Sequence, residues 1–87
     1  MSSLEMGRVV ATPGVLDRFG VAAICALLDR HASGDWGDLN AHDRRENRRA
    51  LKTGTRIFSS YETQQGKMWI ITEADRSSTC VLLPEEY

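Results

Sequence analysis

The chain has 87 residues, of which 41% are hydrophobic and 26% charged, and its formal net charge is −1. This length fits a single domain over residues 1–87, and the composition is that of a globular protein rather than a disordered chain. The nearly neutral charge excludes a general electrostatic attraction to nucleic acid, and equally a strongly acidic mimic of DNA.

The first third of the chain is predicted to hold a short strand and two helical pieces. Residues 1–6 are expected to form a frayed terminus, and Arg8–Ala11 to form the strand. The Thr-Pro pair at 12–13 is a helix start, because Thr can cap free amides and Pro loses no hydrogen bond at the first helical position. Gly20 should end or kink this piece. A second piece over 21–32 carries apolar residues at helical spacing.

The middle of the chain is predicted to form a compact loop followed by a third helix. The loop, at 35–39, places a Trp among two acids and a Gly. Asn40 can cap the next helix, with Asp43 three residues later as in a capping box. This helix should cover 41–52 and end at Gly54.

The last third is predicted to form three strands, at 55–62, 67–74 and 79–83. If a four-residue loop joins the first two strands, Phe58 faces Ile71. Two opposite-charge pairs, Arg56 with Glu73 and Glu62 with Lys67, then fall on the same face as this apolar pair. A slip of one residue would break all of these pairs, so the register is well specified.

The predicted fold class is therefore α+β. We expect an antiparallel three-stranded meander at the C-terminal end and a short N-terminal strand at its edge, with two to three helices packed on one face. Both faces of the predicted sheet carry apolar residues, although the helices can cover only one. The other face must be exposed, meet a partner, or be covered by a terminus, which favours a role in protein–protein contact.

The third helix is unusually rich in arginine, the residue suited to planar recognition of phosphate and carboxylate. It carries Arg44, Arg45, Arg48 and Arg49. Two interpretations are open. The arginines can form a solvated face paired with nearby acids such as Asp35, Asp38 and Glu46. Alternatively, they can form an anion-binding face for nucleic acid or for an acidic protein surface.

Trp36 also has two interpretations. It can fold back as a core anchor, or it can be an exposed contact residue, since Trp is enriched in binding hot spots. We expect it to pack inward.

The turn around Asp75 and Arg76 gathers carboxylates, a guanidinium and hydroxyls, so it is a candidate binding site. General acid–base work together with His31 is the weaker alternative, because Asp75 is an ordinary turn former and a His on an apolar helix face is typical of a hydrogen-bonded core residue. The sequence contains no phosphate-binding loop and no nucleophile elbow. We therefore expect neither an enzyme nor a cofactor.

Cys25 and Cys80 form no CxxC pair and lie among apolar residues, which predicts two buried, reduced thiols. Two His and two Cys scattered along the chain make a poor zinc set. The start of the chain lacks the apolar stretch of a signal peptide, and the run VAAICALL is far shorter than the ~20 residues of a membrane span. We expect a cytoplasmic protein with no membrane partner.

Three segments, VVATPGVL, RHASGDWGDL and WIITEADRSSTCVLLPEEY, resemble a family of small proteins encoded on bacterial plasmids and genomic islands. Members often carry the label "plasmid-related protein" or "type I restriction endonuclease subunit M". The second label does not fit, because a methylating subunit needs a cofactor-binding domain several times this length. The resemblance implies an accessory role in a mobile element, near restriction or other defence genes, and it supplies no active site.

These observations favour a non-enzymatic interaction module. Its partner would be another protein, or a second copy in a homodimer, bound through the exposed sheet face or the arginine helix. The alternative is a nucleic-acid-associated accessory protein that uses the arginine helix.

Overall fold

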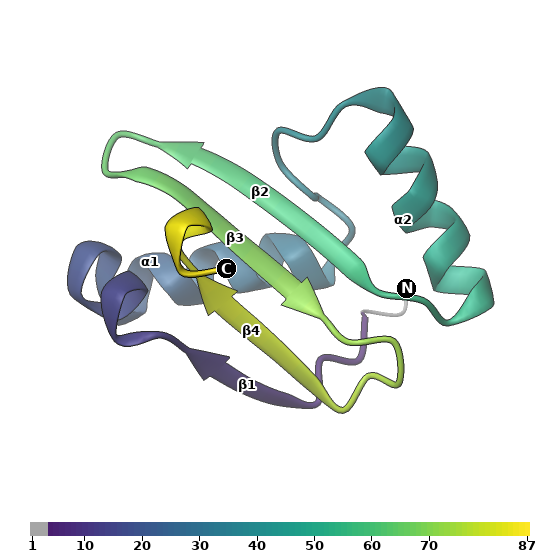
Figure 1. The fold of residues 1–87 in the computed structure, drawn as a ribbon, viewed down its shortest axis with the longest axis horizontal. Coiled ribbons are helices and arrows are strands. Elements are labelled where there is room, and N and C mark those ends of the chain that lie inside the picture. The colour runs from purple at the N-terminus through teal and green to yellow at the C-terminus, as the bar shows by residue number, and fades with distance from the viewer. Residues whose placement is uncertain (1–3) are drawn as a thin grey trace.

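The computed structural model describes residues 4–87 and shows a mixed four-stranded sheet with the strand order β1-β4-β3-β2. The elements are β1 (Arg8–Ala11), α1 (Pro13–Ala32), α2 (Ala41–Thr53), β2 (Ile57–Thr63), β3 (Gly66–Thr72), β4 (Ser78–Leu82) and the 3₁₀ turn η1 (Pro84–Glu86). Strands β2, β3 and β4 form an antiparallel meander, and β1 lies parallel to β4 at the edge (Figure 1). The predicted α+β class, the meander and the N-terminal edge strand are confirmed.

The predicted register of the β2–β3 hairpin is also confirmed. Phe58 lies opposite Ile71. Lys67 Nζ and Glu62 Oε1 are 3.9 Å apart, within salt-bridge distance. The loop is shorter than expected, because residues 63 and 66 pair with each other and leave only two residues between the strands.

Helix α1 begins and bends where the sequence predicts. The Thr12 side chain accepts a hydrogen bond from the backbone N–H of Val15, and Pro13 occupies the first helical position. Gly20 has φ 81° and ψ 164°, which breaks the helical geometry inside α1. This left-handed φ is open to glycine at little cost, so the kink is fixed by the residue type.

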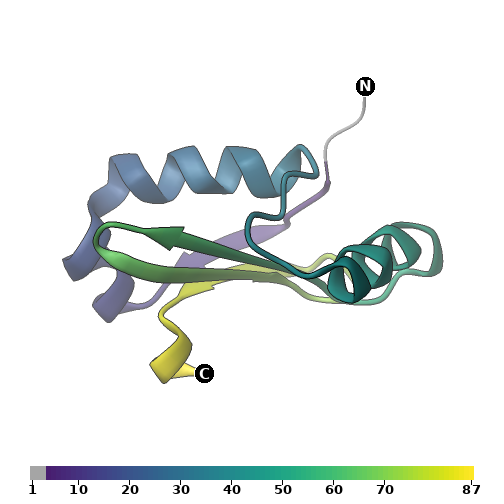
Figure 2. The same cartoon turned by 90° about the horizontal axis from the view of Figure 1, so that it is seen from above.

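Helix α2 is bounded by the predicted caps. The Asn40 side chain accepts from the N–H of Asp43, and Gly54 adopts the left-handed conformation at the C-terminal end. Its position differs from the expectation that the helices share one face of the sheet. Only α1 lies across a face, whereas α2 lies beside the edge strand β2, close to the plane of the sheet (Figure 2).

The core divides into two clusters because the two helices pack at different places. The larger cluster joins α1 to the inward face of the sheet and contains Val15, Ile24, Leu28, Tyr61, Met68, Ile70, Val81 and Leu83. The smaller cluster joins α2 and the preceding loop to β2 and contains Trp36, Leu39, Ala50 and Ile57.

Two expectations are corrected. The frayed terminus is wrong for residues 4–6, since the N–H of Leu4 bonds to the carbonyl of Ala32 and the Met6 carbonyl accepts from Thr79; residues 1–3 lie outside the described part of the chain. Cys25 is a free thiol and exposed, because its neighbour Ile24 takes the position that faces the sheet. Cys80 is also free and only half-buried.

Candidate functional site

The outward side of α2 carries a row of basic side chains, which we call the basic face of α2. Its members are Arg45, Arg48, Arg49 and Lys52. Their i, i+3, i+4, i+7 spacing places them on one side of the helix. The buried residues of α2, Asn47 and Ala50, lie on the opposite side. All four basic residues are exposed.

Two of the three acids expected to neutralise this face, Asp35 and Asp38, bind elsewhere, and Glu46 occurs in none of the ion pairs within residues 4–87. The Asp35 carboxylate lies 2.6 Å from Nε of Arg30, and this bond lowers the pKa of Asp35. The Asp38 carboxylate accepts from the N–H of Glu62 at 2.7 Å. Within residues 4–87, none of the ion pairs involves the basic face of α2. Within residues 4–87 the structure therefore does not contain the predicted ion pairs with Asp35, Asp38 or Glu46.

Arg44 is separate from this face although it belongs to the same arginine-rich run. Its Nε donates to the Leu39 carbonyl and its Nη2 to the Gly37 carbonyl, both at 2.9 Å. Arg44 therefore ties the first turn of α2 to the preceding loop, and its guanidinium is committed to backbone oxygens.

Trp36 packs inward, as expected. Its side chain is 8% exposed and belongs to the smaller core cluster. The loop is pressed against β2, since a Cβ added at Gly37 would clash with the backbone carbonyl of Ser60. Tyr61 of β2 also holds the loop in place, because its hydroxyl donates to the Asp35 carbonyl at 2.6 Å. Trp36 therefore anchors the loop and is not an exposed contact residue.

The turn that holds Asp75 and Arg76 is organised by its own hydrogen bonds. Arg76 adopts a left-handed φ of 60°. Its guanidinium donates to the carbonyls of Thr55 at 2.6 Å and Ala50 at 3.1 Å, which joins the turn to the end of α2. Asp75 accepts from Ser77, and this bonding lowers its pKa. Both candidate residues thus close the turn.

His31 is fully buried and lies in a chain of hydrogen bonds that crosses the inward face of the sheet. Its Nδ1 is 2.6 Å from the Ser59 hydroxyl, and its Nε2 is 2.8 Å from the Thr72 hydroxyl. Thr72 in turn lies 2.7 Å from the Thr79 hydroxyl. The prediction of a hydrogen-bonded core histidine is confirmed, and His31 does not join the Asp75 turn.

The donor and acceptor roles in this series of hydrogen bonds follow from its last bond, between Thr79 and the Met6 carbonyl. Thr79 donates to the Met6 carbonyl at 2.8 Å, so its single proton is used there. Thr72 must then donate to Thr79, and Nε2 of His31 must donate to Thr72. The neutral ring carries its proton on Nε2 and accepts from Ser59 at Nδ1. Burial lowers the pKa of His31 to about 4, which agrees with a neutral ring.

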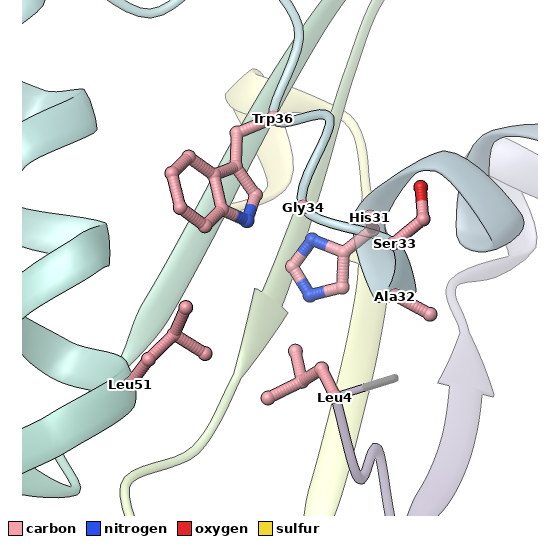
Figure 3. Close-up of a pocket in the computed structure, with 7 residues that line it drawn as sticks. All are labelled: Leu4, His31, Ala32, Ser33, Gly34, Trp36 and Leu51. Carbon is pink, nitrogen blue, oxygen red and sulfur yellow. The ribbon is translucent and has the colours of Figure 1, made fainter. Parts of the chain in front are cut away.

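A small cleft lies next to His31 (Figure 3). It is lined by Leu4, His31, Ala32, Ser33, Gly34, Trp36 and Leu51. Its volume is about 80 Å³. Pockets for drug-sized ligands measure roughly 300–1,000 Å³, so this cleft is too small to hold such a substrate beside the histidine.

The sheet face away from α1 is partly covered by the C-terminal end of the chain. Trp69 makes edge-to-face contacts with Phe58 at 5.1 Å and with Tyr87 at 5.8 Å between ring centroids. Arg56 donates to the Tyr87 hydroxyl at 3.1 Å and lies 3.7 Å from Glu73. Of the three alternatives for this face, coverage by a terminus is therefore present, which leaves a smaller apolar area for a partner.

Three further findings bound the function. Within the described part of the chain, no group of three or more His, Cys, Asp or Glu side chains is placed to hold a metal ion. Neither α1 nor α2 combines the length and apolarity needed to cross a membrane. No protein-family model matches the chain, and no curated protein or solved structure matches it either.

Two structural features were missed at the sequence level. One is the Asn47 side chain, which bonds to the edge of β2. The other is the hydroxyl network around His31. The second could have been predicted from the sequence, because Ser59, Thr72 and Thr79 occupy strand positions that point toward α1. Polar residues at inward positions require a buried polar partner, and His31 is the only residue of its helix face that can provide one.

Proposed function

We propose that this protein is a non-enzymatic interaction module that binds an acidic segment of another protein through the basic face of α2. One observation carries the proposal: four exposed basic side chains share one side of the helix, and no ion pair among residues 4–87 neutralises them.

The crowding of these charges favours an external anion. Arg45 and Arg49 form an i, i+4 pair, as do Arg48 and Lys52, and like-charge pairs of this kind destabilise a helix by a few tenths of a kcal/mol each. Lys52 lies in the last turn of α2, near the negative end of the helix dipole, which offsets part of this cost. Carboxylates of a bound segment would relieve the remainder.

The surroundings favour a peptide over a nucleic acid. Leu51 is 52% exposed, and with Arg48, Arg49 and Lys52 it lines an open hollow. An apolar side chain beside three cations suits a segment that alternates acidic and apolar residues. A phosphate backbone has no apolar side chain that would pack against Leu51. The net charge of −1 also gives no general attraction to a polyanion.

Fluorescence anisotropy can test the proposal with three labelled probes: a Glu-rich peptide containing Leu, a Glu-rich peptide containing Ser instead, and duplex DNA. We expect the Leu-containing peptide to bind most tightly. The double variant Arg45→Glu/Arg49→Glu should weaken its binding by about tenfold or more. The matched control Arg18→Glu/Lys67→Glu changes the net charge equally at other sites and should retain binding.

Two outcomes would reject the proposal. If neither peptide binds the wild type, the basic face has no affinity for acidic segments. If DNA binds more tightly than both peptides, with a steep loss as salt rises and in the double variant, the face is a nucleic-acid site instead.

A further inference from the structure

The two edges of the sheet differ in how their backbone groups are satisfied. On the outer side of β2, Phe58 bonds to the Asn47 side chain through both its N–H and its carbonyl. Ser60 bonds in the same way to the loop, donating to the Trp36 carbonyl and accepting from Asp38. This edge is closed against a further strand.

The edge formed by β1 is open. Arg8 donates to Ser77 and Thr12 donates to Val81, so the alternate residues 8, 10 and 12 direct their backbone groups toward β4. The N–H and carbonyl groups of Val9 and Ala11 consequently point away from the sheet. Within the described part of the chain, β1 is the end of the strand order, and no element pairs with this side.

After the charged Arg8, the side chains of this edge are apolar. Val9 and Val10 are each 42% exposed. Natural edge strands are often short or carry charged residues, Pro or a bulge; β1 is short and begins with Arg8, but Val9 and Val10 carry no charge and no bulge interrupts the pairing with β4. An open, apolar edge is the surface on which another strand adds by main-chain hydrogen bonds.

We infer that β1 pairs antiparallel with β1 of a second copy of this chain, about a two-fold axis through Val10. In this register Val9 lies opposite the partner's Ala11, and the two residues exchange both of their outward hydrogen bonds. The symmetry repeats the pair on the other side of the axis. Val10 meets the partner's Val10 as a non-hydrogen-bonded pair, where side chains approach most closely.

Charge complementarity supports a second copy as the occupant. The same register places Arg8 opposite the partner's Thr12. The hydroxyl of Thr12 donates to the Glu86 carboxylate at 2.6 Å, so that carboxylate lies beside Thr12. The Arg8 guanidinium therefore approaches the partner's Glu86, and the two-fold axis makes two such pairs. Arg8 is exposed and occurs in none of the ion pairs within residues 4–87.

Sedimentation equilibrium over a wide range of concentrations tests the inference. Because β1 has only four residues, we expect a weak monomer–dimer equilibrium for the wild type. Val9→Pro removes an outward N–H without touching the bonds to β4, and should abolish the dimer while the circular dichroism spectrum is retained. Arg8→Glu, which leaves the backbone unchanged, should weaken the dimer by about tenfold or more through repulsion from the partner's Glu86.

The charge-swapped variant Arg8→Glu/Glu86→Lys checks the register, and it should dimerise more tightly than Arg8→Glu alone. A wild type that remains monomeric at every concentration would overturn the inference. A dimer that survives in Val9→Pro would also overturn it, because the contact would then lie elsewhere. If the charge swap restores nothing, the register through Val10 is wrong.

Discussion

The side-chain amide of Asn47 bonds to both backbone groups of Phe58: Nδ2 donates to the carbonyl at 2.6 Å, and Oδ1 accepts from the N–H at 3.2 Å. A neighbouring strand would offer the same donor and acceptor, so one residue of α2 takes the place of a strand on the outer side of β2. Asn47 is 3% exposed, which keeps water from competing for these bonds.

Replacing Asn47 with Ala should therefore destabilise the fold by about 2–3 kcal/mol, because two hydrogen bonds are lost and the backbone groups of Phe58 are left half-buried without partners. Urea unfolding measures this change. Glu46→Ala, at the adjacent exposed position, is the matched control and should stay within about 0.5 kcal/mol of the wild type. Equal stability of the two variants would mean that water replaces the amide at no cost.

This contact also shows where sequence reasoning stops. The hairpin register could be predicted because charge pairs and the Phe58–Ile71 pair agree within a few residues of a turn. The caps of both helices could be predicted because they depend on residues that are adjacent in the chain. The position of α2 beside β2 depends on the hydrogen bonds between the Asn47 side chain and the Phe58 backbone. The sequence does not indicate which backbone groups a polar residue in an arginine-rich helix will bind.

The candidate site was predictable in composition but not in arrangement. The arginine run was evident in the sequence, whereas the separation of Arg44 from the other three depends on carbonyls in the folded loop. The internal pairing was misjudged because Asp35 is five residues from Arg30 and folds back onto it. The exposure of Cys25 was misjudged because its apolar neighbours continue around the helix and give no clear buried side.

Trp36→Ala should cost about 3–5 kcal/mol, since the indole is buried and its removal leaves a cavity between α2 and β2. Chemical denaturation should reveal a large loss of stability. Trp69→Ala removes the same side chain from the half-buried face of the sheet and should cost clearly less. If the order of the two variants is reversed, the Trp69 stack with Phe58 and Tyr87 is the more important anchor.

Arg76 combines an unfavourable backbone conformation with a set of favourable hydrogen bonds, and two substitutions separate them. Both Arg76→Ala and Arg76→Gly lose the guanidinium, but only Ala retains the cost of a left-handed φ. We expect the Gly variant to be more stable than the Ala variant by about 1 kcal/mol, with both below the wild type.

Thermal unfolding of the same pair of substitutions at Ser77 gives the control, because Arg76 is the one non-glycine residue with positive φ within residues 4–87. At Ser77 the order should be reversed, with Ala the more stable. An Ala variant that matches the wild type at position 76 would mean that the bonds to Thr55 and Ala50 contribute nothing, because Ala keeps the left-handed backbone and loses only the guanidinium.

The buried His31 makes the stability of the fold depend on pH. Burial lowers its pKa from the ordinary 6.5 to about 4, so the unfolded chain binds a proton at a higher pH than the folded chain. The stability associated with the neutral ring is complete above pH 6.5 and is lost as the pH falls toward 4. The loss over this window is about 3 kcal/mol, at roughly 1.4 kcal/mol per pH unit.

Urea unfolding at intervals across this window can isolate the contribution of His31. His31→Gln keeps a donor for Thr72 and removes the titrating ring, so its stability should change with pH less steeply than that of the wild type. His42→Gln is the matched control, because His42 is exposed and is the other histidine of the chain, and it should keep the wild-type slope. The carboxylates of Asp35, Asp75 and Glu86 have pKa values lowered by their hydrogen bonds, and the wild type and both variants share these carboxylates. If His31→Gln retains the full wild-type slope, the histidine ring is protonated in the folded state and the proton order derived from Thr79 and the Met6 carbonyl is wrong.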